Sequence, residues 1–340
     1  MKTALITGIS GQDGAYLSKF LLKKKYKIIG LDRRSSRDDR WRLNYLDVEK
    51  SITYEYLDLL EISSIERIFD KYKIDEVYNL AAQSFVASSF DVPISTCDVN
   101  GLGALRILEV IRNKNKKIKF YQASSSEMFG DVLEIPQNEH TAFNPQSPYA
   151  ISKVFAHYIT QNYRTSYGIF ACSGILFNHE SPLRGEEFVT RKITLGLAKI
   201  VSGEINCLYL GNINAKRDWG YAEDYVEAMW KMMQMKKADD YVIAMNKTYS
   251  VKDFINEAVK HYNLKIIWKG KGVNERAINL QNNRTIIKIN PKFFRPAEVN
   301  YLRGNPSKAK KILKWKPKVN FKELVEIMSK AEIKRILGKI

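Results

Sequence analysis

The sequence predicts an α/β protein built on a doubly wound parallel β-sheet, with a smaller and mainly C-terminal lobe. Over roughly its first half, the 340-residue chain alternates apolar strand-like runs with helical stretches, the pattern of a parallel sheet wrapped by helices. A glycine-rich turn, Gly8–Gly14, follows the first of these runs and opens a helix. Beyond residue 176 the alternation breaks into loops and short elements, which predicts the second lobe.

Each predicted strand is a short apolar run, as expected of a strand that is buried in a parallel sheet. The predicted strands are Thr3–Thr7, Lys27–Leu31, Thr53–Tyr56, Glu76–Leu80, Ile118–Gln122 and Gly168–Leu176. The predicted helices between them are Tyr16–Leu22, Ser64–Lys71, Gly101–Arg112 and Pro148–Tyr167. We expect right-handed crossover connections, as nearly all such connections are.

After entering the second lobe, the chain is expected to return to the sheet. Glu223–Met235 has the spacing of an amphipathic helix, and Tyr241–Ala244 is typical of a strand. We therefore predict a dinucleotide-binding domain formed by residues 1–176 and about 216–245. Residues from about 177–215 and 246–340 are predicted to form a lobe that binds substrate over the strand ends.

Composition limits the class of protein. Hydrophobic residues make up 45% of the chain, and Met1–Thr7 enters a strand directly. No apolar run approaches the roughly 20 residues that a membrane helix needs. We therefore expect a cytoplasmic protein with no signal peptide. Three separated cysteines, without a Cys-x-x-Cys pair, predict neither a disulfide framework nor a metal site.

The formal net charge of +18 raises the question of a nucleic-acid partner. The excess lysines are scattered, as in Lys23–Lys25 and Lys308–Lys311, and aromatic residues do not interleave with them as they do in a stacking platform. We expect the charge to attract an acidic small molecule, and we predict no nucleic-acid or membrane partner.

The turn Gly8–Gly14 predicts a dinucleotide site. Glycine lets the backbone turn tightly and approach a pyrophosphate, whose negative charge is favoured by the N-terminus of the following helix. The candidate cofactor-binding residues of this turn are Gly8, Gly11, Gln12, Asp13 and Gly14.

The end of the second strand bears on which dinucleotide binds. An acid at this place, here Asp32, normally binds the ribose hydroxyls of NAD, whereas arginine and serine suit the 2′-phosphate of NADP. Because Asp32 is followed by two arginines and two serines, we predict NADP, with Arg33 and Ser36 as candidate contacts. The further candidates for the adenine and nicotinamide halves are Asp58, Leu59, Leu80, Ala82 and Ser84.

The candidate catalytic residues lie in two segments, Ser124–Glu127 and Tyr149–Lys153. A tyrosine and a lysine four residues apart share one helix face. We expect the ammonium to hold the phenol near ionisation, so that Tyr149 can take a proton from a sugar hydroxyl that Ser125 fixes by a hydrogen bond. Glu127 adds a carboxylate that can remove a proton next to a carbonyl. These residues therefore predict both redox and elimination chemistry.

Together these residues resemble the extended short-chain dehydrogenase/reductase family, and within it most closely the GDP-mannose 4,6-dehydratases. The resemblance runs over nearly the whole chain and is most specific at Phe177–Pro182 and Asn214–Trp219. It implies a Rossmann-type fold and a lyase reaction: NADP⁺ takes hydride from C4 of the sugar, water is lost across C5 and C6, and hydride returns to C6. In that reaction Tyr149 takes the hydroxyl proton, Glu127 takes the C5 proton, and Lys153 binds the nicotinamide ribose.

The resemblance also implies a GDP-linked sugar substrate and a homotetramer or homodimer. The implied substrate contacts are Ser84, Asn178, Glu180, Lys192, Arg217, Arg295 and Glu298. From the residues alone, Arg295 and Glu298 are interpreted as a surface ion pair. The tetramer is implied by the charged segment Arg37–Arg42, because a comparable arginine-rich loop of the family reaches the cofactor site of a neighbouring subunit.

Two departures from the family pattern keep the sugar open. Ser125 stands where the family usually has threonine, which keeps the hydroxyl and opens room beside the sugar, and Phe85 stands where histidine is frequent. GDP-mannose and GDP-manno-heptose therefore both remain candidate substrates. A nucleotide-sugar epimerase is disfavoured by Glu127, and a non-catalytic NADP-binding protein is disfavoured by the full set of reactive side chains.

Overall fold

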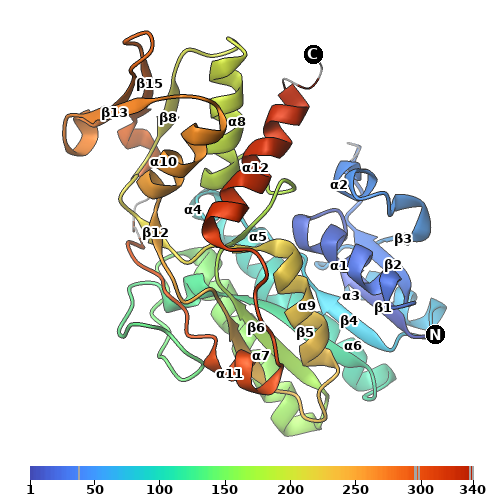
Figure 1. The fold of residues 1–340 in the computed structure, drawn as a ribbon. Coiled ribbons are helices and arrows are strands. Elements are labelled where there is room, and N and C mark those ends of the chain that lie inside the picture. The colour runs from blue at the N-terminus through green and yellow to red at the C-terminus, as the bar shows by residue number, and fades with distance from the viewer. Residues whose placement is uncertain (37–38, 295–296, 298, 337, 339–340) are drawn as a thin grey trace.

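The computed structural model describes residues 1–36, 39–294, 297, 299–336 and 338. Its centre is a seven-stranded sheet of order β11-β6-β5-β4-β1-β2-β3, in which each neighbouring pair is parallel (Figure 1). The strands are β1 (Thr3–Thr7), β2 (Lys27–Asp32), β3 (Thr53–Tyr56), β4 (Glu76–Asn79), β5 (Lys119–Ser125), β6 (Ala171–Leu176) and β11 (Asp240–Ile243). The predicted doubly wound α/β fold is confirmed.

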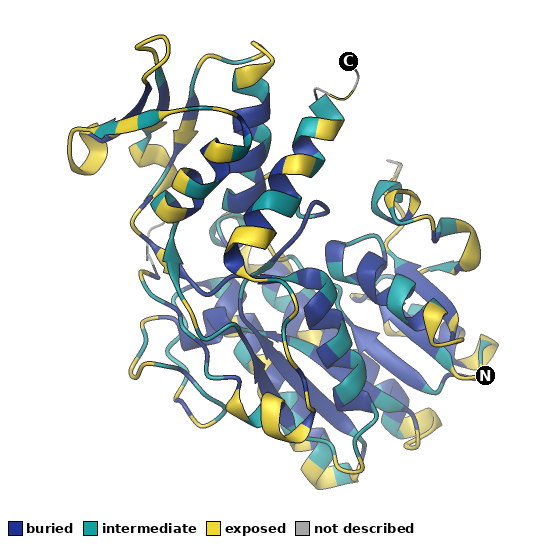
Figure 2. Cartoon of the chain, in the orientation of Figure 1, coloured by how far each residue is buried: buried dark blue, intermediate teal, exposed yellow. Residues whose placement is uncertain are grey.

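Helices cover both faces of this sheet, with their buried sides turned toward it (Figure 2). The buried side chains between helices and sheet form two hydrophobic cores. Successive strand residues point to opposite faces, so Ile6 and Tyr78 join one core while Leu5 and Val77 join the other. The first core is covered by α1 (Gln12–Lys23), α2 (Trp41–Tyr45) and α9 (Ala222–Met233). The second is covered by α3 (Ile62–Lys71), α6 (Gly103–Lys114) and α7 (Pro148–Tyr167).

A second lobe has its own core and lies beyond the strand ends (Figure 1). Its sheet has the order β13-β14-β15-β8, and three helices pack on it. These elements are β8 (Leu208–Leu210), β13 (Ile266–Lys269), β14 (Arg276–Asn279), β15 (Thr285–Ile289), α8 (Val189–Val201), α10 (Val251–His261) and α12 (Phe321–Ile336). The shorter elements are α4 (Ser88–Asp91), α5 (Pro93–Cys97), α11 (Ser307–Ile312), β7 (His179–Glu180), β9 (Lys216–Arg217), β10 (Gly220–Tyr221) and β12 (Tyr249–Ser250).

The strands and helices predicted before residue 177 are present, with differences at their ends. The helix predicted from Tyr16 begins at Gln12, because it starts directly after the glycine turn. The strand predicted from Gly168 begins at Ala171, because Gly168 has a φ of 66° and ends α7. The returning strand, β11, pairs with β6 at the sheet edge. The short helix α2 was not predicted.

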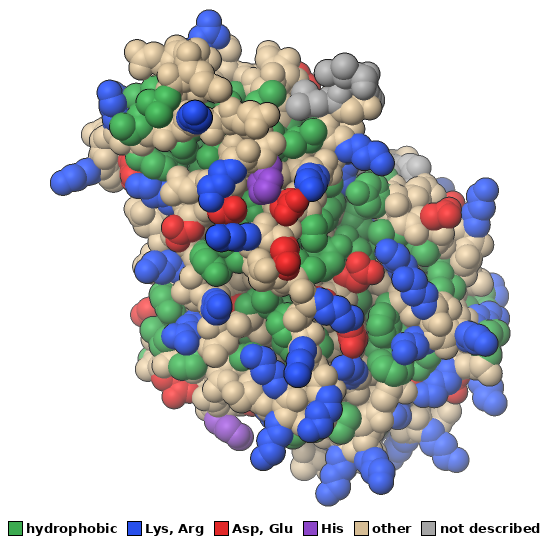
Figure 3. Space-filling model, viewed as in Figure 1, with side chains coloured by type: hydrophobic (Ala, Val, Ile, Leu, Met, Phe, Trp, Pro, Cys, Tyr) green, Lys and Arg blue, Asp and Glu red, His purple; other side chains and the backbone are tan. Residues whose placement is uncertain are grey.

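Two surface properties complete the description. Lysine and arginine side chains are dispersed over the face drawn in Figure 3 rather than gathered in a single stripe. Within the described ranges, no helix combines the length and the apolar character needed to cross a bilayer.

Candidate active site

A cleft of about 660 Å³ opens where the parallel strands end. The strands run in one direction, so their carboxyl ends and the loops that follow them meet at one edge of the sheet. The lining includes residues from five strand ends: Thr7, Leu31, Asp32, Leu80, Ala123–Glu127 and Leu176–His179. The cleft therefore lies where a doubly wound sheet is expected to bind its ligand.

The glycine turn forms the floor of the cleft, and all five of its predicted cofactor-binding residues line it. Gly8 has a φ of 69°, and a Cβ there would lie 2.9 Å from the Ala81 backbone. A Cβ on Gly14 would lie 2.5 Å from the carbonyl oxygen of Gly8. Side chains are therefore excluded at both positions, and the N-terminus of α1 faces the cleft with its backbone exposed to a ligand.

The two residues at the end of β2 differ in character. Asp32 accepts a hydrogen bond from the Ser10 N–H at 3.5 Å, and burial raises the pKa of its carboxyl to about 6. Arg33 also lines the cleft, whereas the predicted contact Ser36 is exposed and lies outside the lining. The cleft wall thus presents the arginine cation of Arg33 directly beside the partly buried acid Asp32.

The other wall is formed by the loop after β4, which contributes Leu80, Ala82 and Ser84 to the lining. Asp58 and Leu59, which follow β3, also line the cleft. Buried polar groups fix this loop. Thr7 Oγ1 accepts from the N–H groups of Leu80 and Ala81 at 3.1 and 3.0 Å. Asn100 Oδ1 accepts from the Gln83 N–H at 2.8 Å, and Asn100 Nδ2 donates to Ser152 Oγ of α7 at 3.1 Å. Asn100 was missed by sequence reasoning because it lies in no recognisable motif.

The four predicted catalytic residues meet in this cleft. Ser147 Oγ accepts from the Ala150 N–H at 3.1 Å and caps α7, which places Tyr149 in the first helical turn. Ser125 ends β5, and its Oγ accepts from the Glu127 N–H at 3.2 Å. The Glu127 side chain is thereby carried on a short turn beside the tyrosine, and it is largely buried.

The expectation that the Lys153 ammonium holds the Tyr149 phenol near ionisation is wrong, because the structure raises the pKa of the phenol. Burial raises the pKa of Tyr149 to about 12, and the hydrogen bond with Ser125 opposes that rise only in part. Lys153 Nζ lies 5.8 Å from the centre of the Tyr149 ring and donates instead to the Ala123 carbonyl oxygen at 2.9 Å. Burial lowers the pKa of Lys153 to about 8. Desolvation therefore dominates both groups.

A histidine that sequence reasoning did not select also lines the cleft. His179 Nε2 lies 2.7 Å from Asp13 Oδ2, and its Nδ1 lies 2.8 Å from the Phe177 carbonyl oxygen. Both partners are acceptors, so the two contacts suit a ring that donates from both nitrogens, as an imidazolium does. Burial by itself would lower the pKa of His179, but the contact with Asp13 has the larger effect, so the pKa is raised. Burial by itself would raise the pKa of Asp13, but the contact with His179 has the larger effect, so that pKa is lowered. A half-buried pair of Asp13 and His179 thus stands in the cleft wall.

The predicted substrate contacts are divided between two places. Asn178 and Ser84 line the cleft. Glu180 does not: it is buried, accepts from Thr190 Oγ1 at 2.5 Å and pairs with Arg184 Nε at 3.2 Å. The Glu180 carboxylate therefore anchors Arg184, a cleft-lining cation that the sequence did not single out.

The remaining predicted contacts lie around the segment 293–301. Lys192 Nζ of α8 is 3.8 Å from the Phe293 ring, and burial lowers its pKa. Arg217 in β9 is buried, and the adjacent Lys216 N–H donates to the Asn300 carbonyl oxygen at 2.9 Å. Arg295 and Glu298 lie outside the described residues. Lys192 and Arg217 thus lie near opposite ends of this segment.

Comparison with known proteins adds sequence relatives along the whole chain. The family model described as GDP-mannose 4,6 dehydratase matches residues 5–328. The GDP-mannose 4,6 dehydratase of Drosophila melanogaster is 50% identical over 98% of this chain and 86% of its own length. The human protein of the same name is 46% identical over 97% of this chain and 91% of its own length.

Solved structures with the same architecture are more distant in sequence. UDP-glucose 4-epimerase from Thermotoga maritima, with UDP-glucose, has a TM-score of 0.82 at 22% identity and covers 98% of this chain and 99% of that chain. dTDP-glucose 4,6-dehydratase from Bacillus anthracis, in complex with NAD, has a TM-score of 0.80 at 20% identity, with coverages of 98% and 97%. RMD from Pseudomonas aeruginosa, complexed with NADPH, has a TM-score of 0.75 at 20% identity, with coverages of 98% and 99%.

Proposed function

The chain belongs to the GDP-mannose 4,6-dehydratase family, and we propose that it converts GDP-mannose into GDP-4-keto-6-deoxymannose by an internal redox elimination of water. The observation that carries this proposal is the presence of Glu127 in the same cleft as Ser125, Tyr149 and Lys153. A hydride-transfer enzyme needs a proton acceptor for the sugar hydroxyl, whereas an elimination also needs a base for a carbon-bound proton. The cleft offers both groups, so the protein is a hydro-lyase of deoxysugar synthesis.

Each side chain has a role in the proposed reaction that follows from its position in the cleft. A nicotinamide dinucleotide bound in the cleft supplies the acceptor for the C4 hydride and the donor that returns it to C6. Tyr149 takes the proton of the C4 hydroxyl, which Ser125 orients by hydrogen bonding. Glu127 takes the proton from C5 once the neighbouring carbon is a ketone and passes it to the C6 hydroxyl, which leaves as water. The proton held on Tyr149 then goes to C5 when hydride is returned to C6, so that protons and hydride balance. Lys153 contributes a cation whose position is held by the Ala123 carbonyl oxygen.

NADP is the cofactor we propose within the nicotinamide dinucleotides. Arg33 on the cleft wall suits a 2′-phosphate. The cleft dimensions and the glycine turn fit the pyrophosphate of either cofactor, and Arg33 is the feature that supports the proposal of NADP.

The nucleotide part of the substrate is proposed to bind between the cleft and the second lobe. Asn178 on the cleft wall, with Lys192 and Arg217 beside the segment 293–301, would contact the diphosphate and the guanosine. Arg295 and Glu298 of that segment complete the proposed set. The cations fit the two negative charges of a diphosphate, and the carboxylate can accept from guanine N–H groups.

A homotetramer, or a homodimer, is the assembly we propose. The outer face of α7 carries Ile151, Phe155 and Tyr158, which are 53%, 41% and 53% exposed. An apolar stripe of this kind on one helix is covered in many proteins by a second subunit. Light scattering of the purified protein tests the proposal, and a monomer at micromolar concentration would overturn it.

The decisive experiment offers GDP-mannose and GDP-manno-heptose in parallel to the NADP⁺-loaded protein and follows each by mass spectrometry. Loss of one water from GDP-mannose supports the proposed function. Faster loss of water from the heptose would reassign the substrate, as the small side chain of Ser125 beside the sugar position permits. A product that retains its C6 hydroxyl would indicate an epimerase, and no turnover of either sugar would overturn the proposal.

A further inference from the structure

Three successive backbone carbonyls in the loop after β7 are each held by an arginine from a different helix. The bonds run from Arg335 of α12 to Pro182 at 2.6 Å, from Arg42 of α2 to Leu183 at 2.6 Å, and from Arg191 of α8 to Arg184 at 2.5 Å. We call residues 182–184 and these three arginines the carbonyl clamp. Because a charged donor makes a stronger hydrogen bond than a neutral one, the clamp fixes this loop firmly.

The clamped loop forms part of the cofactor cleft. The Arg184 side chain lines the cleft, with its guanidinium 3.6 Å from the centre of the Phe188 ring, and Phe188 lines the cleft as well. Arg42 also donates to the Ser10 carbonyl oxygen in the glycine turn at 3.2 Å. The clamp therefore ties the loop to the turn on which the dinucleotide is proposed to rest.

The clamp concentrates positive charge. The guanidinium centres of Arg42, Arg191 and Arg335 lie 4.5, 5.2 and 5.4 Å from the Trp41 ring. Burial lowers the pKa of Arg42 to about 10, and the charge of Arg191 adds to that effect. Three cations around one ring repel one another, so their arrangement depends on a nearby carboxylate.

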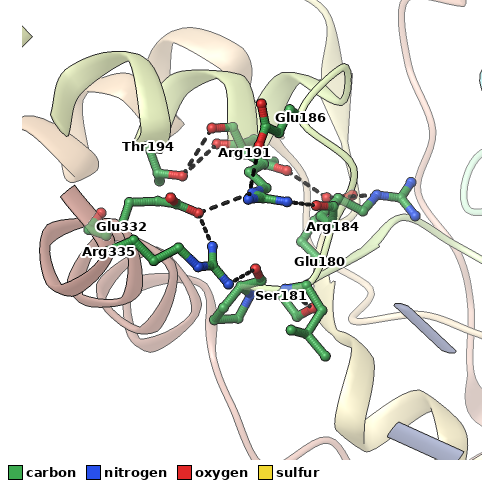
Figure 4. A network of polar contacts seen from close by, with 12 residues as sticks. Glu180, Ser181, Arg184, Glu186, Arg191, Thr194, Glu332 and Arg335 are labelled. Carbon is green, nitrogen blue, oxygen red and sulfur yellow. Dashed lines mark hydrogen bonds and ion pairs between the residues drawn. The ribbon is translucent and has the colours of Figure 1, made fainter. Parts of the chain in front are cut away.

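Glu332 of α12 supplies that carboxylate. Its Oε1 accepts from Arg191 Nε at 3.1 Å and from Arg335 Nη1, and its side chain is 1% exposed. Figure 4 shows the Glu332 carboxylate linked by dashed lines to both of these guanidinium groups. Glu186 also reaches Arg191, at 3.3 Å, but its side chain is 64% exposed and water screens its charge.

We propose that Glu332 is a positioning residue of the cofactor cleft. By orienting Arg191 and Arg335 it holds the carbonyls of Pro182 and Arg184, and so sets where the Arg184 side chain stands on the cleft wall. The inference rests on the proposed function insofar as the cleft is taken to hold NADP. It assigns a cofactor-related role to α12, a helix of the second lobe that contributes no residue to the lining of the cleft.

The experiment compares Glu332→Gln with the matched control Glu186→Gln in the full-length protein. The Kd for NADP⁺ and the Kd for GDP are measured by titration, and kcat is measured at saturating NADP⁺. For Glu332→Gln we expect the Kd for NADP⁺ to rise roughly 2- to 30-fold, with the Kd for GDP and kcat unchanged. Glu186→Gln should leave all three values unchanged. A purely structural role would instead lower the bound fraction of both ligands together.

An unchanged Kd for NADP⁺ in folded Glu332→Gln overturns the proposal. If Glu332→Gln loses GDP binding as well, the variant Arg335→Gln tests the proposal instead. The Arg335 side chain is 22% exposed, so replacing it should disturb the fold less. The replacement releases the Pro182 carbonyl while the pair of Arg191 and Glu332 remains. A raised Kd for NADP⁺ with normal GDP binding in that variant supports the clamp, and an unchanged Kd overturns it. The titrations need no turnover, so failure of GDP-mannose dehydration would overturn the proposed function separately.

Discussion

Replacing Lys153 by methionine should stabilise the fold while removing activity. Burial lowers the pKa of this lysine from 10.5 to about 8, so at neutral pH the folded protein holds a charge in a place that disfavours it. The difference between those two values corresponds to roughly 3 kcal/mol of unfolding free energy. Methionine has a similar length and no charge, and we expect Lys153→Met to recover much of that amount.

The hydrogen bonds at this position allow the replacement. Lys153 Nζ donates to the Ala123 carbonyl oxygen, but Gln122 Nε2 donates to the same oxygen at 3.1 Å, so that oxygen keeps a partner in the variant. Because the donor on Lys153 is lost from the reaction site, we expect kcat to fall roughly 10²- to 10⁴-fold.

The stability advantage of Lys153→Met over the wild type should shrink as the pH rises. The pKa is lower in the folded state, so the cost of the buried charge is full below about pH 8 and vanishes as the pH rises above 10.5, where the unfolded lysine is also neutral. Urea denaturation of nucleotide-free protein at pH 7 and near pH 10.5 should therefore show a large advantage for Lys153→Met at pH 7 and a small one at the higher pH.

A matched control separates burial from the loss of one lysine. Lys116 is exposed, and Lys116→Met should change the unfolding free energy by no more than about 0.5 kcal/mol at either pH. A Lys153→Met protein that is less stable than the wild type at pH 7, or whose advantage does not shrink as the pH rises, would refute the reasoning.

Three further outcomes are expected. Glu127→Gln keeps the shape of the turn and should stop the reaction after oxidation, so that the absorbance of bound NADPH accumulates with GDP-mannose; normal product formation without that absorbance would remove Glu127 from its role. Arg33→Ala should lower the affinity for NADP⁺ and leave that for NAD⁺ nearly unchanged, and an equal loss for both cofactors would argue against a phosphate contact. Asp13→Asn removes the carboxylate that favours the protonated ring of His179, and because the histidine can then give up its proton, the loss in urea denaturation should be about 1.5–3 kcal/mol, the contribution of a charge-assisted hydrogen bond; unchanged stability would show that the pair contributes nothing.

The parts of the protein that local sequence predicts well are those with local causes. Helix α7 begins and ends where the sequence places it, because Ser147 caps it, proline suits its first turn, and Gly168 ends it. The pairing of Asp13 with His179 joins residues 166 positions apart, and no local pattern reports such a contact. The desolvation of Tyr149 and Lys153 likewise depends on the surrounding fold. For that reason, the expectation that the lysine lowers the tyrosine pKa was wrong.

The second lobe shows the same limit. Its strands are short, and their partners come from distant segments, as when β8 pairs in parallel with β15. Short elements of this kind give weak periodicity, so their existence depends on tertiary packing rather than on propensity. Arg184 lies in such a region. Its side chain is held at the cleft wall by contacts with Glu180 and Phe188, and no local sequence pattern predicts those contacts.

The carbonyl clamp has a consequence for the order of events during biosynthesis. Arg335 lies 153 residues after Pro182, whose carbonyl it holds. At ordinary rates of translation a ribosome needs roughly 8–30 s to add that length of chain. During this interval the loop after β7 is already made but lacks one of the three arginines that hold its carbonyls. A nascent chain should therefore acquire firm dinucleotide binding late, after the central sheet has formed, and ribosome-bound intermediates should reveal that delay.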